Sequence, residues 1–268
     1  MHVDLFDCNT MIGRRIHRSR LEFKLPGDLI KEMDHLGISE ALVYHALAKE
    51  YSVTIGNERL MEEIASYDRL HPCWVILPHH TGEIEKPKAL MKALLDRSVR
   101  AVRMFPSPPT PPPEFTLQLH RYPMIETVCG DLLEALQEYR IPLFLEAQTF
   151  LAFQLVSWET IEWILNRYPE LPLVIGGIRQ RDNRSIYALM HRFENLHLDI
   201  SLYGVHRGIE DFTERFGAER LIFGTGLPVF AGSGCVAQLL YAEIDEAQKQ
   251  LIAGGNLKRI LGGIKDGK

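Results

Sequence analysis

Residues 5–13 read LFDCNTMIG, an apolar run that passes through a polar triplet and ends at a glycine. Eight short apolar runs recur along the chain, and each ends in proline, glycine or polar residues. They are His2–Asp7, Ala41–Tyr44, Cys73–Leu77, Arg100–Met104, Leu143–Leu145, Leu173–Ile175, Leu196–Ile200 and Leu221–Phe223. Each is too short for a helix, and nearly continuous apolar runs are typical of strands buried on both faces of a parallel sheet.

Helical patterns lie between these runs. One stretch has apolar residues at the amphipathic spacing i, i+3, i+4, i+7, namely Ile186, Leu189, Met190 and Phe193. We expect Gly37 to end an earlier helix, Asn57 to cap the next one, and Asp245 with Gln248 to form a capping box. Strands that alternate with helices eight times predict a (β/α)8 TIM barrel in one domain, residues 1–268. A doubly wound sheet is the alternative, and the absence of a G-x-G-x-x-G motif after the first strand argues against it.

The composition argues against several classes of function. The 268 residues are 46% apolar, enough for a large core, and 30 basic against 35 acidic residues give a net charge of −5. This balance argues against a general nucleic-acid or membrane-surface binder. The sequence has no run of 18 apolar residues and no signal-peptide pattern, so we expect a cytoplasmic protein. Its four cysteines are far apart, and Cys8 and Cys73, which lie in apolar runs, are expected to be buried thiols.

Four strand ends and a closing segment together resemble a known family. The motifs read LFDCNTMIG (5–13), IPLFLEAQ (141–148), PELPLVIGGI (169–178), AERLIFGTGLPV (218–229) and LIAGGNLKRILG (251–262). In this order they resemble the amidohydrolase-related group of the amidohydrolase superfamily. These are TIM-barrel, metal-dependent hydrolases, and they include decarboxylases that act on aromatic acids. The resemblance covers nearly the whole chain and implies the same barrel.

The resemblance also implies where metal ligands would stand, and this sequence has other residues there. The five family positions are two histidines of the first strand, one each of the fifth and sixth strands, and an aspartate of the eighth. They fall on Asn9, Met11, Glu146, Gly177 and Gly226. An amide, a thioether, one carboxylate and two glycines make a poor transition-metal site. We therefore expect no cofactor and no tightly bound zinc or manganese, while weak Mg²⁺ or Ca²⁺ binding stays open.

Glu146 is the most informative of these positions. A carboxylate at a strand end inside a barrel mouth is partly desolvated, so it could serve as a general acid or base. His45, at the end of the second strand, is the other catalytic candidate, with a purely structural histidine as the alternative. Glu146 could instead pair with Arg103 or Arg179, and pairing is favoured because an unpaired buried charge is costly.

Polar side chains near the strand ends could form a pocket for an anion. The candidate substrate-binding residues are Asn9, Met11, Arg103, Gln148, Arg179 and Arg181. Guanidinium groups bind carboxylates and phosphates through paired hydrogen bonds, which is why the arginines are included. Solvated loop arginines paired with acids are the alternative.

Three hypotheses about function follow. The first is a divergent family member without the metal site that is non-catalytic or binds a small acidic metabolite. The second is a metal-independent hydrolase or lyase that acts on a small carboxylated substrate, a lactone or an aromatic acid, with Glu146 as acid or base. The third is a metal-dependent hydrolase of the family. The expected partner is a small, anionic molecule, and analogy with the family implies a homodimer. We expect the proline-rich segment Pro106–Phe115 to be a rigid spacer, with a fixed wall or lid over the pocket or a partner contact as the alternatives.

Overall fold

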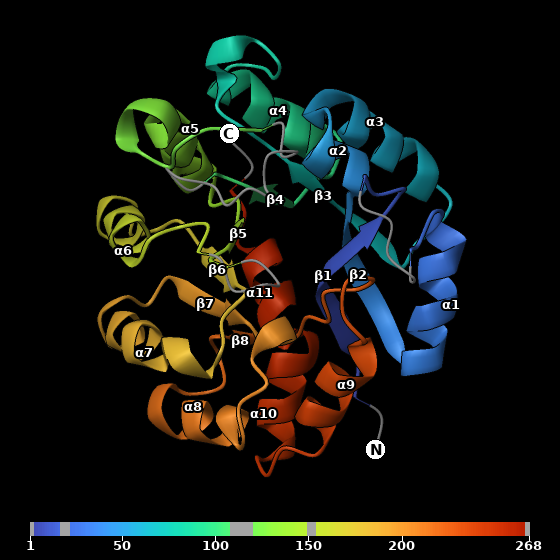
Figure 1. The fold of residues 1–268 in the computed structure, drawn as a ribbon, viewed down its shortest axis with the longest axis vertical. Coiled ribbons are helices and arrows are strands. Elements are labelled where there is room, and N and C mark those ends of the chain that lie inside the picture. The colour runs from blue at the N-terminus through green and yellow to red at the C-terminus, as the bar shows by residue number, and fades with distance from the viewer. Residues whose placement is uncertain (1–2, 17–21, 108–119, 149–153, 266–268) are drawn as a thin grey trace.

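The eight predicted strands form one parallel sheet that rolls into a barrel, with the helices outside it (Figure 1). The computed structural model describes residues 3–16, 22–107, 120–148 and 154–265. The strands are β1 (Leu5–Ile12), β2 (Ile38–His45), β3 (Leu70–Val75), β4 (Ala101–Met104), β5 (Leu143–Glu146), β6 (Leu173–Gly176), β7 (Leu196–Asp199) and β8 (Leu221–Ile222). Each strand pairs with the next one in the sequence. The TIM-barrel prediction is therefore confirmed.

Hydrogen bonds between the first strand and the segment that begins with β8 close the barrel. The Cys8 amide donates to the Phe223 carbonyl at 3.0 Å, and the Met11 amide donates to the Leu227 carbonyl at 2.9 Å. In the opposite direction, the Gly226 amide donates to the Asn9 carbonyl at 2.9 Å. These bonds continue past the end of β8, so the segment after this two-residue strand completes the seam.

The helices follow the predicted amphipathic pattern. They are α1 (Pro26–Leu36), α2 (Ala46–Glu50), α3 (Val53–Ile64), α4 (Pro87–Asp96), α5 (Glu126–Tyr139), α6 (Trp158–Arg167), α7 (Asn183–Arg192), α8 (Gly208–Phe216), α9 (Gly232–Leu240), α10 (Glu246–Gln250) and α11 (Asn256–Gly262). Gly37 ends α1 with φ of 70°, a left-handed conformation that glycine adopts readily. The Asp245–Gln248 capping box at the start of α10 is confirmed by reciprocal bonds of 2.8 and 3.1 Å.

Some predicted boundaries are wrong. The first strand runs to Ile12 rather than ending at Asp7, because its polar residues also face the protein interior and every position in it is buried. Ser52, not Asn57, caps α3. Asn57 lies inside that helix, where its side-chain amide bonds both the carbonyl and the amide of Val75 at 2.8 and 3.1 Å. It therefore ties α3 to the end of β3.

The interior of the barrel is divided into an apolar and a polar part. One apolar cluster consists of Phe6, Cys8, Leu42, Cys73, Ala101, Phe144, Val174 and Ile222 from the strands and Leu257, Ile260 and Leu261 from α11. Helix α11 is held below β8 because the buried Asn256 amide donates to the carbonyls of Ala218 and Leu221. The polar side chains lie beyond this cluster, toward the C-terminal ends of the strands, where the catalytic groups of TIM barrels are found.

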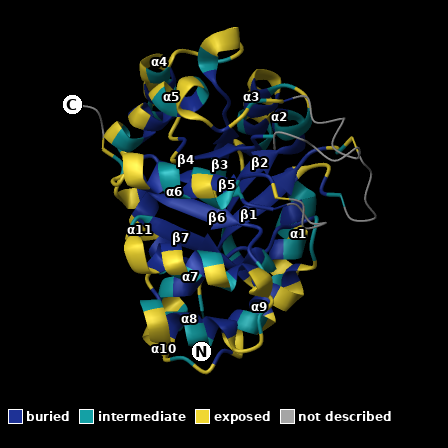
Figure 2. Ribbon diagram, turned by 60° about the vertical axis from the view of Figure 1, so that its left-hand side comes forward, coloured by how far each residue is buried: buried dark blue, intermediate teal, exposed yellow. Residues whose placement is uncertain are grey.

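Burial follows this architecture (Figure 2), with buried strands and helices that expose only their outer faces. All four cysteines are buried free thiols, which confirms the prediction for Cys8 and Cys73. Within the described residues, every helix is too short or too polar to cross a bilayer. The proline-rich segment lies outside the described residues except for Pro106 and Ser107, so its predicted role stays a prediction.

Candidate functional site

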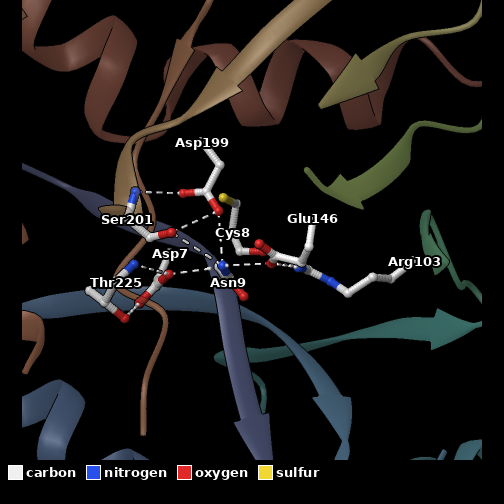
Figure 3. Close-up of polar contacts among 8 residues, drawn as sticks. All are labelled: Asp7, Cys8, Asn9, Arg103, Glu146, Asp199, Ser201 and Thr225. Atoms are coloured by element: carbon white, nitrogen blue, oxygen red, sulfur yellow. Dashed lines mark hydrogen bonds and ion pairs between the residues drawn. The ribbon is translucent and has the colours of Figure 1, made fainter. Parts of the chain in front are cut away.

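A cluster of buried polar side chains occupies the interior of the barrel at the C-terminal ends of its strands (Figure 3). We call these residues the polar centre: Asp7 and Asn9 from β1, Arg103 from β4, Glu146 from β5, Asp199 from β7, Ser201 from the turn Ile200–Leu202, and Thr225 after β8. Six segments of the chain thus supply one continuous network of hydrogen bonds. Two of these residues, Asn9 and Glu146, are among those where the resemblance to the family implies metal ligands.

The side-chain amide of Asn9 joins the two sides of the polar centre. Its Nδ2 lies 2.9 Å from Asp199 Oδ2, 3.3 Å from Glu146 Oε1 and 3.3 Å from Ser201 Oγ. An amide nitrogen carries two hydrogens and can serve both carboxyl groups at once. Asn9 therefore holds two acids close to each other at the barrel mouth.

Arg103 and Glu146 form a partly buried ion pair, so of the two predicted partners, Arg103 and Arg179, Arg103 is the one that binds Glu146. The guanidinium NH1 donates to Glu146 Oε1 at 2.9 Å, and NH2 donates to the Cys8 carbonyl at 3.0 Å. The rings of Tyr44 and Phe144 lie against the guanidinium, 4.9 and 5.2 Å from its central carbon. Burial alone would lower the pKa of Arg103, but its neighbours raise it above the usual value, so the charge is retained.

Arg103 is only 1% exposed, so it lies beneath the surface of the site rather than facing a ligand. The Glu146 side chain remains 17% exposed. Within the described part of the chain, its hydrogen bonds involve Oε1 alone, while Oε2 is directed over Gly176. Glu146 is therefore the charged group of this pair that a small molecule can reach.

Asp199 is the second acid of the pair, and its side chain is almost fully buried. Burial, together with the nearby charge of Glu146, raises its pKa to about 6, although bonds from Ser201 oppose the change. The Ser201 amide donates to Oδ1 at 2.8 Å and its hydroxyl to Oδ2 at 3.0 Å. Asp199 therefore titrates near neutral pH and can hold or release a proton under physiological conditions.

Two glycines make room for these acids. A Cβ at Gly176 would lie 2.9 Å from Glu146 Oε2 and 3.1 Å from Asp199 Oδ2. A Cβ at Gly224 would lie 2.3 Å from Asp199 Oδ1. The absence of side chains at both positions lets the two carboxyl groups approach each other above the barrel interior.

Asp7 and Thr225 form a bond between β1 and the segment after β8. The Thr225 hydroxyl donates to Asp7 Oδ2 in a short hydrogen bond, and the amides of Thr225 and Asn9 donate to Oδ1 at 3.0 and 2.9 Å. Complete burial raises the pKa of Asp7 to about 7 despite these donors. Asp7 thus orients Asn9 and supplies a further carboxyl group whose charge changes near neutral pH.

The structure brings only some of the predicted site residues to the polar centre. Met11 packs in an apolar cluster with Tyr44 and Phe105. The His45 ring points away from the barrel interior: its Nδ1 accepts from the Leu47 amide at the start of α2, and its Nε2 lies 3.6 Å from a carboxylate oxygen of Glu63. The structure thus gives His45 a place at the helix cap and does not bring it to Glu146.

Gln148 and Arg179 lie together at the ends of β5 and β6. Gln148 Nε2 donates to Asp182 Oδ1 at 2.6 Å, and Arg179 NH1 donates to Gln148 Oε1 at 3.3 Å. The Arg179 backbone amide donates to Asp182 Oδ2 at 2.8 Å, which fixes the loop. Arg179 is partly buried, whereas Arg181 is exposed on the same loop. Of the predicted anion-binding arginines, Arg179 is thus the one held at the mouth.

Gly177 and Gly226, where the resemblance implies two further ligands, have no side chain that could bind a metal. Gly177 and Gly226 both have positive φ, 76° and 71°, which disfavours any side chain. A Cβ at Gly177 would meet the Gln148 carbonyl oxygen at 2.6 Å, and one at Gly226 would meet the Phe230 ring at 2.3 Å. Gly176, rather than Gly177, faces the carboxyl groups. Among the described residues, no group of three histidine, cysteine, aspartate or glutamate side chains could hold a metal ion. The residues present do not fit the transition metal that the family implies.

Sequence reasoning missed Asp199, Ser201 and Thr225. A signal for Asp199 was present, because it lies near the end of the apolar run Leu196–Ile200, and strand ends on this side of a barrel point into the mouth. No comparable signal marks Ser201 or Thr225, since short hydroxyl side chains are common in loops.

Comparisons with known proteins agree with this architecture. A family model described as amidohydrolase matches residues 37–263. No curated protein matches the chain. An uncharacterised TIM-barrel protein from Bordetella bronchiseptica is 19% identical, with a TM-score of 0.73 and coverage of 97% of this chain and 99% of that one.

Two further solved structures are similar in fold. A dihydroxybenzoic acid decarboxylase from Polaromonas sp. JS666, with bound manganese and the inhibitor 2-nitroresorcinol, is 13% identical with a TM-score of 0.71 and 97% coverage of both chains. A protein from Acinetobacter baumannii described as a 2-pyrone-4,6-dicarboxylic acid hydrolase, with citric acid bound, is 13% identical with a TM-score of 0.66; 97% of this chain and 99% of that one are covered. At these identities the likeness shows the fold alone.

Proposed function

The chain belongs to the amidohydrolase family, and from that premise we propose that it is a hydrolase or lyase acting on a small carboxylated substrate, an aromatic acid or a lactone, by acid–base chemistry without a transition metal. The observation that carries the proposal is the pair of acids, Glu146 and Asp199, that Asn9 joins at the barrel mouth.

The two acids have different environments, which is how enzymes assign acid and base roles to a carboxyl pair. Arg103 pairs with Glu146 Oε1 at 2.9 Å, and the Glu146 side chain is the more exposed of the two, so we assign Glu146 the role of base. Asp199 has a pKa near 6 and retains a proton in part of the molecules at neutral pH, so it serves as the buried proton store of the pair behind the more exposed Glu146. Asn9 bonds both groups and keeps their spacing constant during proton transfer.

These roles support two closely related reactions. With a lactone, Glu146 removes a proton from a water molecule as the water oxygen bonds to the carbonyl carbon. The ring C–O bond then breaks, and the leaving oxygen receives a proton from the acid pair. With an aromatic acid, the carbon that bears the carboxylate receives a proton from the acid pair. The C–C bond then breaks, its electrons return to the ring, and carbon dioxide leaves.

Arg179 is the group proposed to bind the carboxylate of the substrate. Gln148 and Asp182 hold its loop at the mouth, and a guanidinium matches the geometry of a carboxylate. The names of two structural neighbours, a decarboxylase of dihydroxybenzoic acid and a hydrolase of a pyrone dicarboxylic acid, support an acidic substrate. Arg181, which is exposed on the same loop, would add positive charge around the mouth.

The neighbour from Polaromonas contains manganese, and that chemistry is not part of this proposal. Two observations support a reaction carried by the side chains alone. Gly177 and Gly226, where the resemblance implies ligands, have positive φ. Glu146, the one carboxylate at such a position, is bound to Arg103.

The test is a turnover screen of chelator-treated protein against lactones and hydroxylated aromatic acids. We expect turnover that survives chelation and is lost in Glu146→Gln, which keeps the hydrogen-bonding shape but cannot act as a base. Glu138→Gln, an exposed position on α5, is the matched control and should remain fully active. Turnover that depends on added manganese or zinc would contradict the proposal.

The emptied ligand positions also favour a second candidate, a non-catalytic protein that binds a small acidic metabolite. In that case the panel would give no turnover, while one of its acids would still raise the melting temperature. Arg179→Met would abolish this shift, since the binding arginine is common to both candidates.

A further inference from the structure

The charges of the polar centre do not balance. Within the described residues the centre contains three carboxyl groups, Asp7, Glu146 and Asp199, and one cationic side chain, Arg103. Carboxylates buried together repel one another and favour protons or cations nearby. Arg103 is thus the permanent positive charge that allows Glu146 and Asp199 to lie over the same glycine.

The position of Arg103 is built in rather than adjustable. Its guanidinium donates to Glu146 and to the Cys8 carbonyl of β1, and aromatic rings lie on it from β2 and β5. The carboxylate that it binds and Asn9, which bonds the same oxygen, are both residues where the resemblance to the family implies metal ligands. The arginine therefore acts at the place where a cation would be needed in a metal-bearing relative.

We propose that Arg103 is the resident cation of this site, a positioning residue that takes over the charge-balancing role of a metal ion and excludes divalent cations from the polar centre. The inference deepens the proposed function, because it identifies what organises the acid pair in a metal-free reaction. A divalent cation and the Arg103 charge therefore compete for the same carboxylates.

Removing the arginine charge should therefore create a cation site. In Arg103→Met the oxygens of Glu146, Asp199 and Ser201 would remain close together around Asn9 Nδ2, and such hard oxygen ligands suit Mn²⁺. A fixed charge a few ångströms from a divalent ion repels it strongly, so the variant should bind Mn²⁺ at least about 100-fold more tightly than the wild type.

The experiment measures Mn²⁺ binding by electron paramagnetic resonance and by the shift in melting temperature, on chelator-treated proteins. We expect one Mn²⁺ per chain and a raised melting temperature for Arg103→Met, and neither effect for the wild type or for Arg103→Lys, which retains the charge. Arg100→Met is the control, because Arg100 is exposed on the same segment and contacts the Leu261 carbonyl at the other end of the barrel. The double variant Arg103→Met/Glu146→Gln should lose the new Mn²⁺ site.

The outcomes are distinct even if the single variant is unstable. If Arg103→Met unfolds, folding that is restored by Mn²⁺ supports the proposal, and failure of Mn²⁺ to restore it contradicts the proposal. Tight Mn²⁺ binding by the wild type, a folded Arg103→Met that binds no Mn²⁺, or unchanged binding in the double variant would each overturn it. None of these readouts uses a substrate, so a failed turnover screen would refute the proposed function and leave this inference standing.

Discussion

Substitution of Gly176 by alanine tests whether the two acids lie where the structure has them. The backbone of Gly176 has no positive φ, so alanine fits the strand and the effect comes only from its methyl group. That group would lie 2.9 Å from Glu146 Oε2 and 3.1 Å from Asp199 Oδ2, whereas an ordinary contact begins at 3.4 Å. Glu146 must therefore move away by about 0.5 Å, the difference between 3.4 and 2.9 Å.

This movement affects bonds that have little room to lengthen. The bond from Asn9 to Glu146 is already 3.3 Å long, and the bond from Arg103 is 2.9 Å. The substitution should lower the free energy of unfolding by about 2 kcal/mol. It breaks the Asn9–Glu146 bond, weakens the Arg103–Glu146 bond and leaves some crowding around the new methyl group. Misplacement of a catalytic group by a fraction of an ångström should also lower kcat/KM by at least about tenfold.

Urea denaturation measures the loss of stability, and the turnover screen measures the activity. The matched control is Gly234→Ala in α9, where a Cβ meets no atom within 4 Å, so its stability should be unchanged or higher. If Gly176→Ala had a free energy of unfolding within about 0.5 kcal/mol of the wild type and the same turnover, the acids could not be packed over this glycine, and the reasoning would be wrong.

Three further predictions concern other parts of the molecule. Burial raises the pKa of Asp7 to about 7 and that of Asp199 to about 6, from an ordinary value of 3.8. Between about pH 4 and about pH 7 the folded state therefore binds more protons than the unfolded state, so the free energy of unfolding falls as the pH rises. Urea denaturation should show this fall from about pH 4 to about pH 7, and a less steep one in Asp199→Asn. A stability that rises across this range in the wild type and the variant alike would contradict the assignment. Asn57→Leu should lower the free energy of unfolding by about 3 kcal/mol, since it leaves the amide and carbonyl of Val75 without partners; a loss below about 1 kcal/mol in denaturation would count against this role. His45→Gln should lower the free energy of unfolding by about 1 kcal/mol, because it removes the cap of α2, and should leave kcat unchanged. A large fall in kcat without a change in stability would instead show that His45 is catalytic.

The fold could be predicted because its signals are repeated. Eight apolar runs separated by amphipathic stretches specify a barrel even when individual boundaries are wrong. The boundary of β1 was misjudged because the residues Asp7, Asn9 and Thr10 are polar yet buried, and hydrophobicity alone does not identify such positions. A shift of register between Asp7 and Thr10 adds to the irregularity, and no sequence pattern announces it.

The site was predictable to the extent that it depends on strand ends and charge. That Glu146 pairs with an arginine followed from the cost of a lone buried charge, but the choice of Arg103 over Arg179 came only from the structure. The orientation of the glycines did not follow, because the motif indicated Gly177, whereas alternation from the inward-facing Val174 places Gly176 toward the interior. The turn that brings Ser201 back to Asp199 depends on tertiary structure that the sequence does not display.

The bond between Asp7 and Thr225 spans 218 residues, nearly the whole length of the chain. A ribosome therefore releases β1 long before its partner exists, and the first strand must wait with its edge open while seven other strands are synthesised. Contacts of such high sequence separation form late because their loop-closure entropy is large. Closure of the seam is thus expected to be the last step of folding, and pulse-labelling hydrogen exchange would detect it as late protection of the Cys8 and Met11 amides. Early protection of these amides would contradict this order. The carboxyl group that orients Asn9 thereby makes assembly of the polar centre conditional on a complete barrel.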